Sequence, residues 1–207
     1  MARNVRLGFH ERVEMERLFH VSDQAEIKRF EPRVSPSENP FAGDDKVVWA
    51  IGERLLHNYL FPRDCPRVTF YAGAQTTESD VARFWQVSTA KYIVAIESSW
   101  VPQMLAERLY CYEFASETFE KAGEVARYYL SREAVEPIAV TVYSDLFLEL
   151  ARRGVEVRIL PSLWPLRDAV VDSSVHFSII RMRNAQPREI LGVYRVWFLR
   201  IISIFVV

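Results

Sequence analysis

Short runs rich in β-branched and aromatic residues recur along this chain, and they constrain its fold more than any other feature. The run Tyr-Ile-Val-Ala-Ile-Glu at 92–97 is almost wholly apolar, which is typical of a strand in the middle of a sheet. Further runs of this kind predict strands over residues 18–22, 47–51, 67–72, 109–114, 127–131, 138–142, 155–160 and 177–182. Since the runs do not alternate strictly with helices, they predict an α+β fold with a mixed, mainly antiparallel sheet core and several short helices.

Helix signals are short and lie between these runs. The clearest covers 146–153, where Ser144 or Asp145 can cap the first turn and Gly154 can end the helix. We expect other helices over 53–60, 76–84, 99–107, 118–125 and 165–171. The proline-rich stretch 31–45 predicts a loop.

Composition favours one folded domain. Of the 207 residues, 50% are hydrophobic, which is sufficient for a sizeable core. We expect a single globular domain over 15–187, a loose extension over 1–14 and an atypical hydrophobic tail over 188–207. The tail predicts a last strand or an apolar helix, with attachment to a membrane surface as the alternative.

Charge and cysteine content limit the classes of partner. The net charge of -1 argues against broad binding to nucleic acid, although Arg181 and Arg183 form a local basic cluster. The first residues are polar and do not resemble a signal peptide, and Cys65 and Cys111 have no paired spacing. We therefore expect a cytoplasmic protein with no bound metal and no membrane span.

Common catalytic motifs do not occur in the sequence, and one histidine carries the main hint of chemistry. There is no Gly-x-Gly-x-x-Gly, Walker or Gly-x-Ser-x-Gly sequence, which argues against Rossmann, P-loop and α/β-hydrolase sites. His20 lies inside the apolar run from Leu18 to Val21. A polar ring in such a run needs a partner or binds a ligand, so both a backbone-bonded core histidine and a ligand-binding one stay open.

Several segments resemble known families. Over about residues 16–187, the chain resembles a family of bacterial proteins of unknown function, on the segments Leu-Phe-His-Val-Ser (18–22), Phe-Glu-Pro-Arg (30–33), Val-Trp-Ala-Ile (48–51), Asn-Tyr-Leu-Phe-Pro-Arg-Asp-Cys-Pro-Arg-Val-Thr-Phe-Tyr-Ala (58–72) and Ser-Leu-Trp-Pro-Leu (162–166). More distantly, it is similar to the ADP-ribosyltransferase fold. Those enzymes often open with a strand that holds a histidine, and they take an aromatic residue and a glutamate from later elements.

The second resemblance implies an NAD site. His20 would hydrogen-bond the adenosine-side ribose, and Tyr59, or else Trp49, would stack on the nicotinamide. The pyrophosphate needs arginines or backbone N–H groups, and Arg33, Arg63 and Arg67 are the candidates. A carboxylate would bind the nicotinamide ribose and stabilise an oxocarbenium-like transition state, with three candidates: Glu133, Glu136 and Glu113.

Two functions follow from these observations. The first is an NAD-binding enzyme related to ADP-ribosyltransferases, and the second is a non-catalytic protein of the same fold that binds a small ligand or a partner. Each candidate residue also has a structural interpretation. The arginines can be surface charges, Tyr59 can pack on a sheet, and Glu133 and Glu136 can be exposed loop carboxylates.

Overall fold

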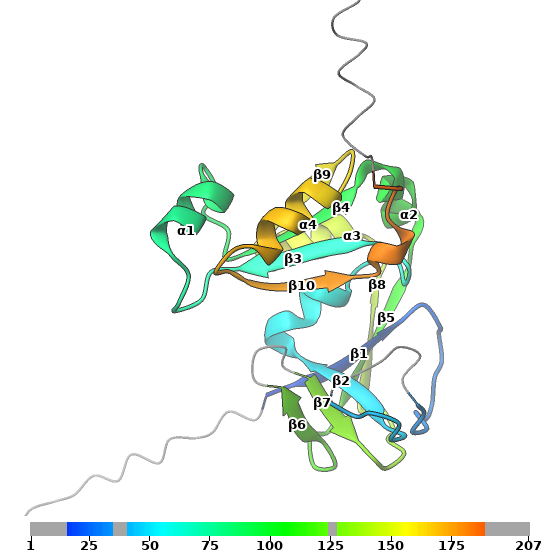
Figure 1. The fold of residues 1–207 in the computed structure, drawn as a ribbon. Helices are drawn as coiled ribbons and strands as arrows, with labels where there is room; N and C mark the ends of the chain where they lie inside the picture. Colours follow the sequence, from blue (N-terminus) through cyan, green and yellow to red (C-terminus); the bar gives the residue numbers. More distant parts are fainter. Residues whose placement is uncertain (1–15, 35–40, 124–127, 189–207) are drawn as a thin grey trace, which may run out of the picture. The chain divides into compact units, whose positions relative to one another are not determined.

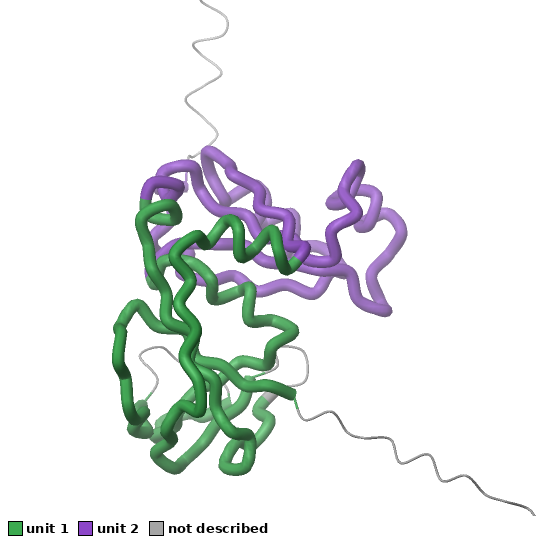
Figure 2. Tube along the Cα trace, turned by 180° about the vertical axis from the view of Figure 1, so that it is seen from behind, with its two compact units in different colours: residues 1–63, 103–153 green, residues 64–102, 154–207 purple. Residues whose placement is uncertain are grey.

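A computed structural model describes residues 16–34, 41–123 and 128–188, and it divides the chain into two compact units (Figure 2). The first unit comprises residues 1–63 and 103–153, and the second comprises residues 64–102 and 154–207. The single domain expected over 15–187 stays a prediction. The expected extension over 1–14 and residues 189–207 of the expected tail lie outside the described residues.

The first unit is built on a six-stranded sheet with the strand order β6-β7-β2-β1-β5-β8 (Figure 1). Every neighbouring pair of strands in it is antiparallel. Its strands are β1 (Leu18–Ser22), β2 (Val48–Gly52), β5 (Leu109–Phe114), β6 (Glu120–Gly123), β7 (Tyr128–Ser131) and β8 (Ala139–Tyr143). The 3₁₀ helix η1 (Glu53–Tyr59) follows β2, and helix α3 (Leu146–Arg152) follows β8.

The two faces of this sheet carry different side chains. Because side chains alternate along a strand, Leu18, His20 and Ser22 lie on one face of β1, and Phe19 and Val21 lie on the other. The first face carries a core cluster formed by Leu18, Phe30, Val48, Ala50, Tyr112, Phe114 and Val135. The hydroxyl of the fully buried Tyr112 donates to the Gln24 carbonyl at 2.7 Å and accepts from the Ile27 N–H at 3.1 Å. Tyr112 therefore holds the segment that follows β1, at Gln24 and Ile27, by two hydrogen bonds.

The second unit contains a four-stranded sheet with the order β10-β3-β4-β9. Its strands are β3 (Arg67–Tyr71), β4 (Tyr92–Glu97), β9 (Val155–Leu160) and β10 (His176–Ile180). Strands β4 and β9 are parallel, and the other two pairs are antiparallel. Every residue of β4 is buried, which confirms the central strand predicted from its apolar run. Together, the two sheets confirm the α+β class with mainly antiparallel pairing.

The remaining helices are short. In the second unit, α1 (Glu78–Trp85) and α4 (Trp164–Val171) supply side chains to a core cluster with β3 and β4. The other short elements are η2 (Ser98–Trp100), α2 (Val101–Ala106) and η3 (Met182–Asn184). Helix α3 has the predicted ends, because Asp145 accepts from the Leu148 N–H and Gly154 has a φ of 66°. Within the described residues, no helix is long and apolar enough to cross a membrane.

The helix expected over 118–125 is wrong. Strand β6 occupies Glu120–Gly123 instead and pairs with β7 through Glu120–Leu130 and Lys121–Tyr129. Glutamate, lysine and alanine favour a helix locally, but pairing with an existing sheet edge outweighs so weak a preference. Between β1 and β2, the chain bends over 23–30, and Phe30 forms a bridge to Val135.

Candidate functional site

His20 lies at the point where β1 and β2 separate. The two strands pair at Leu18–Gly52 and Phe19–Ile51, and the His20 ring then places Nδ1 2.9 Å from the carbonyl oxygen of Trp49. A carbonyl can only accept a hydrogen bond, so Nδ1 must carry the proton that is donated to it. In the neutral ring, Nε2 is then left as an acceptor. No hydrogen-bond partner for Nε2 is present among the described residues.

The surroundings keep this imidazole neutral. The ring is partly buried, with its centroid 5.0 Å from that of Phe30. Burial is the main cause that lowers the pKa of His20, and the nearby charges of Arg33 and Arg63 lower it further, although the bond to Trp49 opposes them. The site therefore presents a neutral acceptor nitrogen beside two cations.

The two cations differ in their partners. Arg33 is exposed, and its backbone is fixed by N–H···O bonds of 3.2 and 3.1 Å with Val47. Its guanidinium has no ion-pair partner in the part of the chain that the structure describes. Arg63, by contrast, donates two hydrogen bonds to Asp23. Arg33 is therefore the cation beside His20 that is available to an anionic ligand.

Two of the predicted acids, Glu133 and Glu136, lie on a loop near His20. Glu133 and Glu136 follow β7, and both are exposed. Between them, Val135 exchanges backbone hydrogen bonds of 2.8 and 3.0 Å with Phe30, whose ring contacts His20. The Glu136 carboxylate lies 4.0 Å from Arg29. The structure thus places this loop near His20 in the same unit, with both carboxylates at its surface.

The predicted aromatic residues lie on the opposite face of the sheet from His20. Tyr59 donates from its hydroxyl to that of Tyr128 at 2.8 Å, and the Trp49 ring lies 5.8 Å from Tyr128. Tyr128 is paired with Ile51, which shares its face with Phe19 rather than with His20. The structure therefore does not bring Tyr59 or the Trp49 ring together with the His20 imidazole. The Trp49 indole N–H is buried without a hydrogen-bond partner among the described residues.

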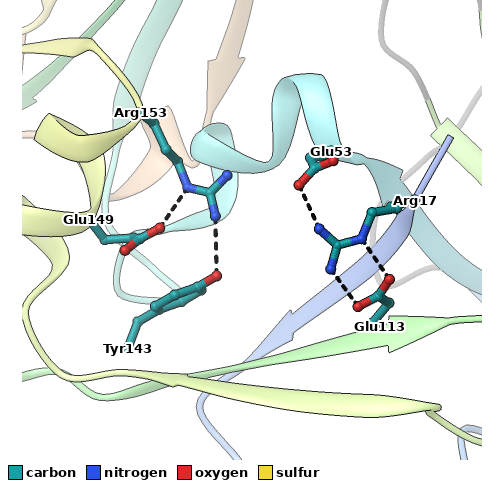
Figure 3. Close-up of polar contacts among 6 residues, drawn as sticks. All are labelled: Arg17, Glu53, Glu113, Tyr143, Glu149 and Arg153. Atoms are coloured by element: carbon teal, nitrogen blue, oxygen red, sulfur yellow. Dashed lines mark hydrogen bonds and ion pairs between the residues drawn. The ribbon is translucent and has the colours of Figure 1, made fainter.

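Glu113 also lies on this opposite face. Arg17 donates to both of its carboxylate oxygens at 2.7 Å and to Glu53 at 2.9 Å, so the guanidinium lies between two acids (Figure 3). The hydrogen bonds from Arg17 are the main cause that lowers the pKa of Glu113. Glu113 is therefore an ionised carboxylate that is already bound to an arginine, and it is paired across the sheet with Phe19.

The first unit also contains a hydrogen-bonded cluster of Arg153, Glu149 and Tyr143, which the sequence analysis did not predict. Arg153 donates to Glu149 at 3.0 Å and to the Tyr143 hydroxyl at 3.1 Å (Figure 3). Cys111, which lies near Arg153 and Glu113, is buried, and burial raises the pKa of its thiol to about 12. A thiol with so high a pKa is a structural group rather than a nucleophile. Only the helical spacing of Glu149 and Arg153 could have indicated this ion pair.

Arg67 belongs to the second unit. It is 3% exposed, and its guanidinium donates to the Cys65 carbonyl at 2.8 Å. The basic cluster lies in the same unit, where Arg181 is 3.9 Å from Asp64. Of the predicted ligand-binding residues, the structure therefore groups His20 with Arg33 and Arg63. The loop that holds Glu133 and Glu136 lies near them.

These observations define an α+β protein whose antiparallel sheet holds a neutral histidine beside two arginines. The chain belongs to a family of unknown function, DUF6886, whose model matches residues 19–185. The matched range contains His20, Arg33 and Arg63. Comparisons with curated proteins and with solved structures find no match.

Proposed function

We propose that this chain binds NAD through His20 and Arg33, and that it acts as an enzyme related to ADP-ribosyltransferases. One observation carries the proposal. The bond from His20 Nδ1 to Trp49 leaves Nε2 as an acceptor, and the guanidinium of Arg33, which has no ion-pair partner among the described residues, lies nearby. An acceptor nitrogen suits a ribose hydroxyl, and an arginine suits a phosphate.

The chemical roles follow from these positions. Nε2 of His20 accepts a hydrogen bond from a ribose hydroxyl, while Arg33 and Arg63 donate to the pyrophosphate. When the bond between nicotinamide and the ribose C1′ breaks, nicotinamide leaves with the bonding electrons, and an adjacent carboxylate stabilises the positive charge on the ribose until water or an acceptor nucleophile bonds to C1′. Glu133 and Glu136 are the acids proposed for this step, because their loop is bonded to Phe30 beside His20.

The second candidate function is ligand binding without catalysis. It is favoured by the positions of the two acids, since Glu136 lies beside Arg29 and the side chains of Glu133 and Glu136 are both exposed.

Release of nicotinamide from NAD, measured by chromatography, separates the two functions. An enzyme releases nicotinamide, and Glu133→Gln or Glu136→Gln reduces the rate by at least about a hundredfold. A binding protein releases none.

Isothermal titration with NAD tests the proposed site. We expect the intact chain to bind and Arg33→Ala to weaken binding by about tenfold, because a charge-assisted hydrogen bond is lost. The Arg33 side chain is exposed and has no ion-pair partner among the described residues, so the thermal midpoint should not change. The matched control is Arg83→Ala, which removes an exposed arginine of α1 in the second unit. Equal weakening in both variants, or no binding by the intact chain, contradicts the proposal.

A further inference from the structure

Asp23 and Arg63 form a two-point ion pair beside His20. Arg63 donates from Nε to one carboxylate oxygen of Asp23 at 3.0 Å and from Nη2 to the other at 2.7 Å. The two residues lie forty positions apart in the sequence. Asp23 directly follows β1, the strand that holds His20, and Arg63 follows η1. This geometry fixes the plane of the guanidinium, because both contacts use one of its edges.

Stability alone gives a weak reason for this pair. The side chains of Arg63 and Asp23 are 49% and 36% exposed, and exposed ion pairs contribute little to stability. The hydrogen bond from Arg63 is the main cause that lowers the pKa of Asp23, so the carboxylate is charged at neutral pH. The two hydrogen bonds therefore hold the guanidinium in one orientation more than they stabilise the fold.

Arg63 also acts on the site already described. Its charge is close enough to His20 to lower the pKa of the imidazole. A free arginine side chain loses rotamer entropy when it is fixed, which opposes binding. An arginine held in place before the ligand arrives has already lost most of this entropy, so the ligand binds more tightly.

We propose that Asp23 is a positioning residue that directs Arg63 toward a phosphate of the ligand bound beside His20, an inference that rests on the proposed function. The aspartate does not touch the ligand and acts through the guanidinium that it holds. The ligand class is then a nucleotide with at least one phosphate within reach of Arg63, rather than a nucleoside.

Titration of NAD and of adenosine into four variants tests this role. We expect Asp23→Asn to weaken NAD binding by about fivefold without altering adenosine binding, and Asp23→Glu to restore part of the loss. Arg63→Met should weaken NAD binding as well, and Asp23→Asn should add no further loss in that background. The control is Asp45→Asn, which removes an exposed carboxylate paired with Arg132 and should leave binding unchanged.

The outcomes separate this inference from the proposed function. If the intact chain does not bind NAD, the proposed function is overturned, and the role of Asp23 is overturned with it. If the intact chain binds NAD and Asp23→Asn binds it equally or more tightly, only the role of Asp23 is overturned. Equal losses for NAD and adenosine in Asp23→Asn also overturn it, because they indicate a general disturbance of the site.

Discussion

Replacing Glu97 by alanine should lower the free energy of unfolding by about 3–5 kcal/mol, which would leave much of the protein unfolded. Glu97 ends β4 and has 0% exposure. Its two carboxylate oxygens accept from the backbone N–H groups of Leu163 at 3.2 Å and Gln186 at 2.9 Å. Alanine leaves both donors without an acceptor; the N–H of the fully buried Leu163 then costs about 1–3 kcal/mol, whereas the exposed Gln186 can bond to water.

The buried charges near Glu97 increase this effect. Arg67 lies on the adjacent strand β3 and is 3% exposed. Burial is the main cause that raises the pKa of the Cys65 thiol to about 12. The charge of Glu97 also raises this pKa, whereas the charge of Arg67 lowers it. Both charged groups therefore lie close to the Cys65 sulfur. Removing the acid leaves the arginine with less compensation for its burial.

Chemical denaturation at neutral pH measures the change in unfolding free energy. Glu97→Gln should lose less than Glu97→Ala, because the amide keeps one acceptor oxygen and fills the same volume. The control is Glu78→Ala in the first turn of α1, an exposed position at which the loss should be at most about 1 kcal/mol. Wild-type stability in Glu97→Ala would contradict the role of these hydrogen bonds.

Acidification should destabilise the protein through His57, with a total effect of about 3 kcal/mol. His57 lies in η1 and is 4% exposed. Burial is the main cause that lowers its pKa to about 4, and the charge of Arg153 contributes. The unfolded chain, with a pKa of about 6.5, therefore binds a proton more readily than the folded one. Stability is complete above about pH 6.5 and is lost as the pH falls toward 4.

The measurement compares unfolding free energies at about pH 7 and about pH 5. Over this interval His57 should account for a loss of about 2 kcal/mol, and His20, whose pKa is also lowered, should add to it. His57→Gln removes the titrating group, so its stability should change less with pH than that of the wild type. The control Gln103→Ala replaces an exposed residue of the first unit that carries no titrating group, and it should keep the full pH dependence. Identical pH dependence in wild type and His57→Gln would contradict the assignment.

The sequence predicted the elements better than it predicted the faces of the sheet. Strand β4 was predicted because its run is apolar throughout, and α3 was predicted because Asp145 and Gly154 mark its ends. Strand β6 was missed because its pairing with β7 overrides local helix preference. Pairing of this kind depends on distant residues, which a single sequence does not reveal.

The same limit applies to the candidate site. His20 was singled out correctly as a polar ring that needs a partner, and the Trp49 carbonyl is that partner. Tyr59 and Glu113 were grouped with His20 because nothing in a single sequence gives the register of the strands. A shift of one residue moves every side chain to the other face. Glu97 was not singled out either, because the Leu163 and Gln186 N–H groups that bind it are remote in sequence.

Imidazole nitrogen NMR reports directly on Nε2 of His20, the atom proposed to accept a hydrogen bond from the bound nucleotide. Spectra of ¹⁵N-labelled protein at neutral pH should show a neutral His20 ring protonated at Nδ1, with the resonance assigned by its loss in His20→Gln. Adding NAD should shift the Nε2 signal while Nδ1 stays bonded to Trp49. An Nε2 signal that stays unchanged at saturating NAD, or an Nδ1 without its proton, would contradict the claim.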